Sequence, residues 1–225
     1  MKVLAVISQK GGVGKTTIAT ALAVAAEAAG KSVAVFDLDP QASACFWADR
    51  RKATGKGDTP AVKDINAVRI AHYLAAMKDA GADLIILDCP PVHREIADAA
   101  LGAADMVLIP TRAEALDIRA MMQTVKLAQQ MNKRPSVVLT FCPPTGAEID
   151  QARQLARDLG ADVAPVEIHA RKAFSRAQQD GLTAQESEPG GKAADEIRQL
   201  YEYTNITLYG VKQHGKAKGQ SKQRV

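Results

Sequence analysis

Residues 2–17 read KVLAVISQKGGVGKTT, and this stretch decides the fold class. An aliphatic run typical of a buried strand leads into a glycine-rich turn, and a helix-forming segment follows from Thr16. The backbone N–H groups of such a turn and the positive end of the helix can surround a polyphosphate, because glycine leaves room for close approach. The predicted nucleotide-phosphate loop comprises Lys10, Gly11, Gly12, Val13, Gly14, Lys15, Thr16 and Thr17.

The residues at the end of this loop carry the chemistry. We expect Lys15 to reach the β and γ phosphates, the Thr16 hydroxyl to ligate Mg²⁺, and Thr17 to bond a phosphate oxygen. A dinucleotide fingerprint starting at Gly12 would need glycine at position 17, where threonine stands, so that interpretation fails. A glycine-rich turn without a ligand stays as the simpler alternative.

The rest of the chain alternates strand-like and helix-like segments. The strand-like runs are continuous aliphatic stretches, as expected for a parallel sheet covered on both faces: Lys2–Ser8, Ser32–Asp37, Asp83–Asp88, Met106–Pro110, Pro135–Phe141 and Asp162–Ile168. The predicted helices are Thr16–Ala29, Val68–Ala80, Arg94–Ala103, Leu116–Gln130, Glu148–Leu159, Ala170–Asp180 and Lys192–Tyr209. The fold class is therefore α/β, with a mostly parallel twisted sheet flanked by helices on both faces.

Length and charge set the domain plan. The 225 residues, 47% of them hydrophobic, suit one domain over residues 1–209. The formal net charge is +4, yet residues 210–225 alone contribute +5 and hold no acid, so the rest carries −1. The tail has few apolar residues, which predicts disorder. No apolar run is long enough for a membrane helix, and we expect no integral membrane association.

Three carboxylates follow predicted strands. Asp37 and Asp39 end the second strand in FDLDPQ, and Asp88 follows four aliphatic residues in LIILDCPP. Carboxyl ends of parallel strands hold ligands in α/β sheets, so we expect Asp88 to bind a water of the Mg²⁺ shell and one of the other two to face the phosphates. Helix capping by Asp37 or Asp39 is the structural alternative.

The segment KGGVGKTT has lysine rather than the usual glycine near its start, and with VFDLDPQ and LDCPP the chain resembles the ParA/MinD family of P-loop ATPases. It is most similar to small ParA-type proteins without an N-terminal helix-turn-helix domain. The resemblance implies that Lys10 crosses a nucleotide-sandwich homodimer to the partner's phosphate. It also implies that Asp39 orients the attacking water, with Asp37 in support. The absence of an NKxD guanine motif favours ATP over GTP.

The same resemblance implies a partition switch. The ATP-bound dimer would coat nonspecific DNA, and a ParB-like centromere-binding partner would stimulate slow hydrolysis to segregate or position plasmid or chromosomal DNA. We expect a cytoplasmic protein that is associated with the nucleoid in the ATP state. Basic residues of the C-terminal half are the candidate DNA contacts: Lys172, Arg176, Lys192, Arg198, Lys212, Lys216 and Lys218.

Other functions stay open at this point. A MinD-like membrane ATPase would carry a C-terminal amphipathic helix, but the tail lacks large apolar residues on one face. Positioning of another protein cargo fits the same motifs, as does a small-substrate biosynthetic ATPase, although no substrate motif can be identified. Asp37, Asp39 and Asp88 argue against an adaptor that binds nucleotide without hydrolysing it. A solvated tail without any partner is the alternative to DNA binding.

Overall fold

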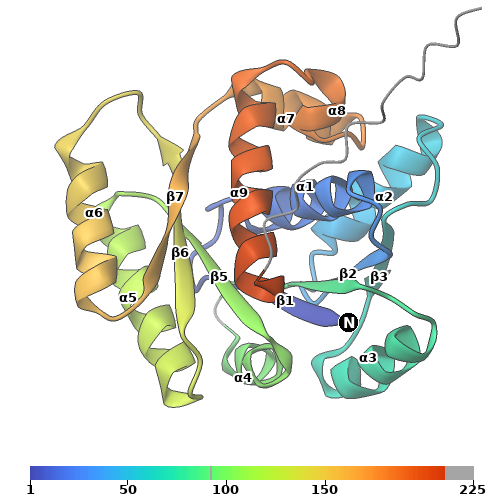
Figure 1. The fold of residues 1–225 in the computed structure, drawn as a ribbon, viewed down its shortest axis with the longest axis horizontal. Helices are drawn as coiled ribbons and strands as arrows, with labels where there is room; N and C mark the ends of the chain where they lie inside the picture. Colours follow the sequence, from blue (N-terminus) through green and yellow to red (C-terminus); the bar gives the residue numbers. More distant parts are fainter. Residues whose placement is uncertain (92, 211–225) are drawn as a thin grey trace, which may run out of the picture.

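The strands of the computed structural model, which describes residues 1–91 and 93–210, build one sheet that runs through the middle of the molecule (Figure 1). The strands are β1 (Lys2–Val6), β2 (Val33–Asp37), β3 (Ala61–Asp64), β4 (Leu84–Asp88), β5 (Met106–Thr111), β6 (Pro135–Cys142) and β7 (Asp162–His169). The helices are α1 (Lys15–Ala28), α2 (Ser43–Ala53), the 3₁₀ turn η1 (Ala67–Arg69), α3 (Ile70–Asp79), α4 (Arg94–Ala103), α5 (Ala115–Gln130), α6 (Ala147–Asp158), α7 (Lys172–Gln179), α8 (Ala184–Ser187) and α9 (Lys192–Tyr209).

All neighbouring strands run parallel, in the order β3-β2-β4-β1-β5-β6-β7. The predicted α/β class with a parallel sheet is confirmed. After β1 the chain adds β2, β3 and β4 on one side of that strand, and it then adds β5, β6 and β7 on the other side. Ligands of open α/β sheets bind where the strand order reverses in this way. The loop after β1 therefore starts at the switch point of the sheet.

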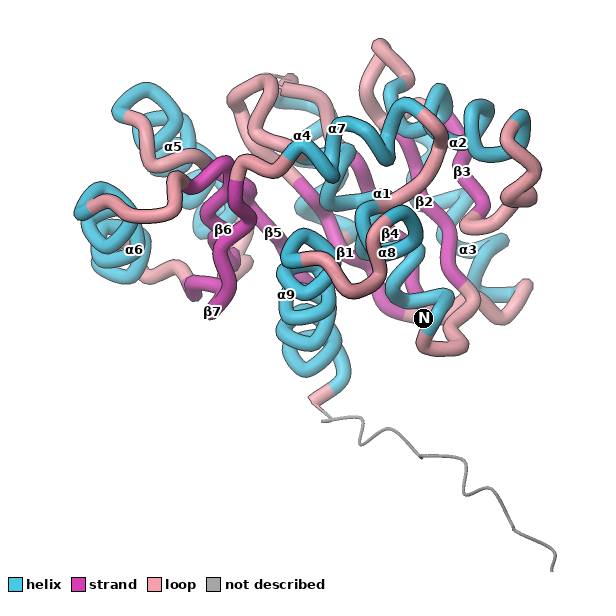
Figure 2. Tube along the Cα trace, turned by 90° about the horizontal axis from the view of Figure 1, so that it is seen from above, coloured by secondary structure: helices cyan, strands magenta, loops and turns pink. Residues whose placement is uncertain are grey.

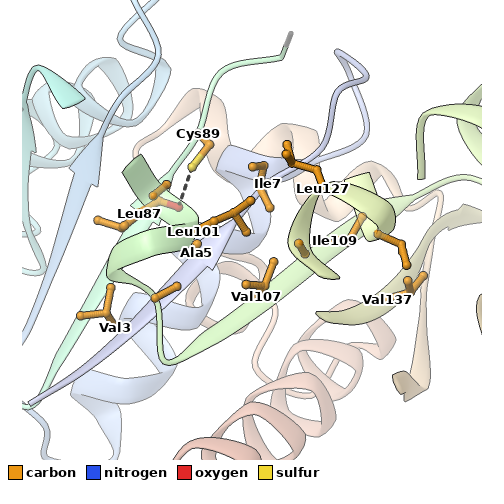
Figure 3. Packing of buried hydrophobic residues seen from close by; sticks show 14 of the residues in the cluster. Val3, Ala5, Ile7, Leu87, Cys89, Leu101, Val107, Ile109, Leu127 and Val137 are labelled. Carbon is orange, nitrogen blue, oxygen red and sulfur yellow. Dashed lines mark hydrogen bonds between the residues drawn. The ribbon is translucent and has the colours of Figure 1, made fainter. Parts of the chain in front are cut away.

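Alternating side chains of each strand pack against helices on opposite faces. Val3, Ala5 and Ile7 join a buried cluster with α3, α4, α5 and α6, as Figure 3 shows for the β1, α4 and α5 contributions. Leu4 and Val6 face the other side, where α1 and α9 cover the sheet. The tube view shows helices along both sides of the strands (Figure 2). Both faces of β1 are thus buried, which explains its continuous aliphatic sequence.

The structure adds elements to the sequence prediction. The edge strand β3 and the short helix α8 were not among the predicted segments, and α2 was anticipated only as the helix that Asp37 or Asp39 would cap. Helix α9 coincides with its predicted bounds. The predicted basic tail lies outside the described residues apart from Gly210. Over residues 1–91 and 93–210, no helix combines the length and apolar character needed to cross a bilayer.

Candidate nucleotide site

The phosphate loop joins β1 to α1 at the carboxyl edge of the sheet. Gly12 and Gly14 adopt left-handed backbone angles, with φ of 72° and 88°, and Gly14 is the N-cap of α1. A residue with a side chain adopts such angles at a cost, so glycine is needed at both positions. The first turn of α1 contains no acid, which leaves its positive end open to an anion. The local geometry is that of an anion-binding nest.

Lys15 lies at the first position of α1 and is buried. Its Nζ donates a 3.0 Å hydrogen bond to the carbonyl of Lys10, across the mouth of the loop. Burial lowers the pKa of Lys15, while the charges of Asp88 and Asp39 act in the opposite direction. The predicted loop residues are therefore brought together, and the Lys10 backbone anchors the ammonium that we expect to reach phosphates.

Asp88 ends β4 beside the loop, level with Val6 of β1 and Asp37 of β2. It is 1% exposed, and neither carboxylate oxygen accepts a hydrogen bond from the described residues. Burial raises its pKa to about 7, and two neighbours act in the opposite direction: the Thr16 hydroxyl, which lies nearby but does not meet hydrogen-bond geometry in this structure, and the charge of Lys15. A buried carboxylate without partners is costly unless a ligand completes it. Its oxygens fit a hydrated Mg²⁺ ion, which prefers oxygen ligands and keeps its water shell.

Asp37 and Asp39 differ in their contacts. Asp37 is fully buried and accepts backbone N–H bonds from Asp39, Ala44 and Cys45, at 3.1, 2.8 and 3.1 Å. It thereby caps the N-terminus of α2, which agrees with the structural alternative for this residue. Asp39 is half-buried, and its carboxylate accepts a 3.0 Å bond from the N–H of Gln41. Of the two, Asp39 has more freedom to meet a ligand, and the catalytic roles of both stay predictions.

A largely apolar cavity of about 370 Å³ opens beside the loop, and sequence analysis did not predict it. Gly14 and Thr17 line it from the phosphate loop and α1, Phe141 and Ile168 from β6 and β7, and Phe174 from α7. The volume and the aromatic lining suit a planar heterocycle next to the phosphates. The cavity is therefore the candidate base pocket, and Thr17 borders it.

Helix α2 is tied to the segment that follows α7. Four side-chain donors bond backbone carbonyls of this segment at 3.0 to 3.2 Å: Trp47 Nε1 to Leu182, Arg50 Nε to Gln179, Arg51 Nη1 to Gly181, and Thr54 Oγ1 to Asp180. Arg51, which is buried, also forms an ion pair with the half-buried Glu186 at 2.9 Å. Carbonyls at a helix C-terminus lack partners within the helix. Side chains of α2 supply those partners, so the segment after Asp39 is fixed to the wall of the cavity.

The candidate DNA contacts are only partly free. Lys172, Arg176 and Lys192 are exposed, and Lys172 also borders the base pocket. Arg198 is exposed but forms an ion pair with Asp195 and donates to the Pro189 carbonyl at 2.9 Å. Lys212, Lys216 and Lys218 lie outside the described residues. The arrangement leaves α7 as the best-placed basic surface next to the nucleotide site.

Two residues that contact the phosphate loop were also missed. Arg112 follows β5, and Phe141 is the penultimate residue of β6. Both lie at the carboxyl edge, which is the signal that could have selected them. Neither belongs to a local motif, so their contact with the loop becomes visible only in the folded chain.

Comparisons with known proteins agree with this geometry. Residues 4–184 match the CobQ/CobB/MinD/ParA nucleotide binding domain. The chain is 35% identical to the maintenance of carboxysome distribution protein A of Gloeobacter kilaueensis, over 81% of this chain and 83% of that protein. It is 28% identical to Protein ParA of Rhizobium radiobacter, over 86% and 90% of the respective chains.

Solved structures share the fold. The MinC:MinD cell division protein complex of Aquifex aeolicus superposes with a TM-score of 0.74 at 18% identity, covering 96% of this chain and 100% of that one. A Cyanothece McdA–ATP complex gives 0.69 at 20% identity, covering 95% and 98%. At these identities the likeness concerns the fold alone. The family match and the sequence relatives show that the chain belongs to the CobQ/CobB/MinD/ParA nucleotide-binding family.

Proposed function

We propose that this protein is an ATP-dependent switch that dimerises with ATP bound, binds nonspecific DNA in that state, and hydrolyses ATP when a partner protein stimulates it. The carrying observation is the buried carboxylate of Asp88, which has no hydrogen-bond partner among residues 1–91 and 93–210 and lies beside Lys15 and the glycine loop. A buried carboxylate next to a lysine and a glycine loop suits a site that binds a phosphate ligand together with a metal ion. The switch would segregate or position DNA or another cargo.

The residues divide the chemistry among them. Lys15 and the loop N–H groups would hold the phosphates, the Thr16 hydroxyl would ligate Mg²⁺, and Asp88 would hold a metal-bound water. Bound Mg²⁺ supplies positive charge that offsets the charge of the phosphates. Asp39, which is not committed to capping a helix, would orient the attacking water. The cavity beside Thr17 would take the adenine ring.

Dimerisation would bring a second lysine to each phosphate. Lys10 is half-buried, and its side chain makes no hydrogen bond to any described residue. Its ammonium is therefore free to act across a two-fold interface, which agrees with the resemblance to ParA-type proteins. Slow hydrolysis by the chain alone would let the dimer persist until a ParB-like or other cargo-bound partner arrives.

The DNA surface would lie on α7, with Lys192 at the start of α9 nearby. Lys172 and Arg176 are both exposed there, so their charges are accessible to a phosphate backbone. The named relatives include a carboxysome distribution protein, so the cargo need not be DNA itself. The proposal predicts a cytoplasmic protein on the nucleoid in its ATP state.

Cosedimentation tests this proposal. Wild type, Arg176→Glu and the matched control Lys126→Glu, an exposed cation of α5 on the opposite face of the sheet, are spun with duplex DNA or anionic liposomes. We expect retention on DNA only with ATP, weakening as salt rises, and a several-fold loss in Arg176→Glu alone. Arg176 is preferred to Lys172 because it does not border the base pocket.

The other outcomes of the same experiment are also informative. Retention on liposomes instead of DNA would favour a membrane-placed ATPase of the MinD type. Retention on neither would favour action on protein or small-molecule partners. Retention on DNA that is equal with ATP, with ADP and without nucleotide would contradict the switch.

A further inference from the structure

Arg112 reaches the outer side of the phosphate loop from the segment that follows β5. Its Nη2 donates to the carbonyl of Gly12 at 2.5 Å, although the two residues are 100 positions apart in the sequence. A Cβ on Gly12 would lie 3.6 Å from the same nitrogen. The left-handed glycine at the top of the loop is therefore held from outside by a charged side chain.

The guanidinium of Arg112 also lies on the ring of Phe141, 4.3 Å from its centroid. That ring contacts the position that a Cβ of Gly14 would occupy, at 3.5 Å, and lines the candidate base pocket. Cation–π contacts of this kind stabilise the stacked arrangement. Arg112 and Phe141 together thus touch the two glycines of the phosphate loop that have positive φ, Gly12 and Gly14.

The direction of this contact matters for phosphate binding. In an anion-binding nest the backbone N–H groups point inward and the carbonyls point away. A donor on the outer carbonyl of Gly12 favours that orientation, and a charged donor makes a stronger bond than a neutral one. The other contacts of Arg112 are weak, since Glu114 lies 3.8 Å away and the buried Nε has no partner among the described residues.

We propose that Arg112 is a positioning residue for nucleotide binding, which keeps the Gly12 carbonyl turned away from the phosphates and joins the loop to the aromatic wall of the cavity. This inference rests on the proposed nucleotide site and adds a residue that lies outside its motifs. Arg112 acts through the loop, so its loss weakens the binding of any polyphosphate, whether or not that ligand carries a base.

Calorimetric titration with two probes tests this role. ATP and inorganic tripolyphosphate are titrated into wild type, Arg112→Ala, Arg112→Lys and the control Arg119→Ala, an exposed arginine of α5. We expect Arg112→Ala to raise both dissociation constants about tenfold. Arg112→Lys recovers part of the loss, because an ammonium can donate to the carbonyl but lacks the planar guanidinium that lies over Phe141. Arg119→Ala leaves both constants unchanged.

Several results would overturn the inference. Equal constants in Arg112→Ala and Arg119→Ala would remove the role of Arg112 while leaving ATP binding by the wild type, and thus the proposed function, intact. A loss for ATP without one for tripolyphosphate would assign Arg112 to the base pocket instead. If the wild type binds neither probe, the proposed function fails together with this inference. Thermal unfolding without ligand checks that each variant is folded, and Arg112→Lys carries the comparison if the alanine variant is not.

Discussion

Replacing Asp88 with asparagine should stabilise the nucleotide-free protein at neutral pH and weaken its Mg²⁺-dependent binding of ATP. The wild-type carboxylate is buried with no hydrogen bond from any residue that the structure describes, and burial raises its pKa from 3.8 to about 7. Asparagine has nearly the same shape but no charge to desolvate. The substitution therefore removes a cost that the wild type pays only when Asp88 is ionised.

The magnitude follows from the pKa. In the unfolded chain Asp88 ionises near pH 4, and in the folded chain near pH 7, so the folded state binds more protons between these values. Wild-type stability is therefore lost as the pH rises through this window. At about 1.4 kcal/mol per pKa unit, the loss amounts to up to about 4 kcal/mol between pH 4 and pH 8. The cost of burying an uncharged amide does not change with pH and cancels from this difference.

Urea unfolding in EDTA, without nucleotide, measures the effect. Wild type, Asp88→Asn and the control Asp49→Asn, an exposed carboxylate of α2, are compared from pH 4 to pH 8. We expect the difference in free energy of unfolding between Asp88→Asn and the wild type to grow in favour of the variant as the pH rises. The difference between Asp49→Asn and the wild type should stay constant with pH. A difference between Asp88→Asn and the wild type that does not change with pH would refute the reasoning, since burial would then not disfavour the ionised form of Asp88.

Two further pairs of substitutions test the structural roles assigned to buried side chains. Arg51→Ala should lower the free energy of unfolding by about 3 kcal/mol in urea titrations, because it removes a buried guanidinium that bonds Glu186 and the carbonyls of Thr59 and Gly181. The exposed neighbour Arg50→Ala should cost under about 1 kcal/mol, and equal costs would show that the contacts of Arg51 add nothing. Asp37→Ala should cost about 1–2 kcal/mol through loss of the α2 cap, whereas Asp39→Ala should leave stability nearly unchanged. The reverse order of the last two stabilities would contradict the assignment of Asp37 as the cap.

The central strands could be predicted from the sequence because they are buried on both faces. Runs such as LIILD in β4 are continuously apolar, and every residue of that strand is buried. Strand β3 has no such pattern, since it lies at the sheet edge with Ala61, Lys63 and Asp64 exposed. Helix α2 buries only Ala44, Trp47 and Arg51 along its length, and it is fixed by contacts with residues 179–186. Such contacts leave no local periodicity in the sequence.

The same distinction applies to the site. The phosphate loop is a contiguous motif, so its residues and their order were visible before folding. The contact between Arg112 and Gly12 joins the segments that follow β5 and β1, two strands that are neighbours only in the sheet, and no local pattern encodes it. Asp37 and Asp39 are equivalent by spacing, and only the start of α2 shows which of them is engaged as a cap.

Sedimentation velocity of the Asp39→Ala protein, with Mg²⁺ and either ATP or ADP, tests the central claim most directly. This variant should bind ATP without hydrolysing it, so the account predicts a dimer in ATP and a monomer in ADP. Adding Lys10→Ala should return the ATP-bound protein to a monomer while leaving its affinity for ATP largely intact. The same mass in both nucleotides, or a dimer that persists without Lys10, would contradict a nucleotide-sandwich switch.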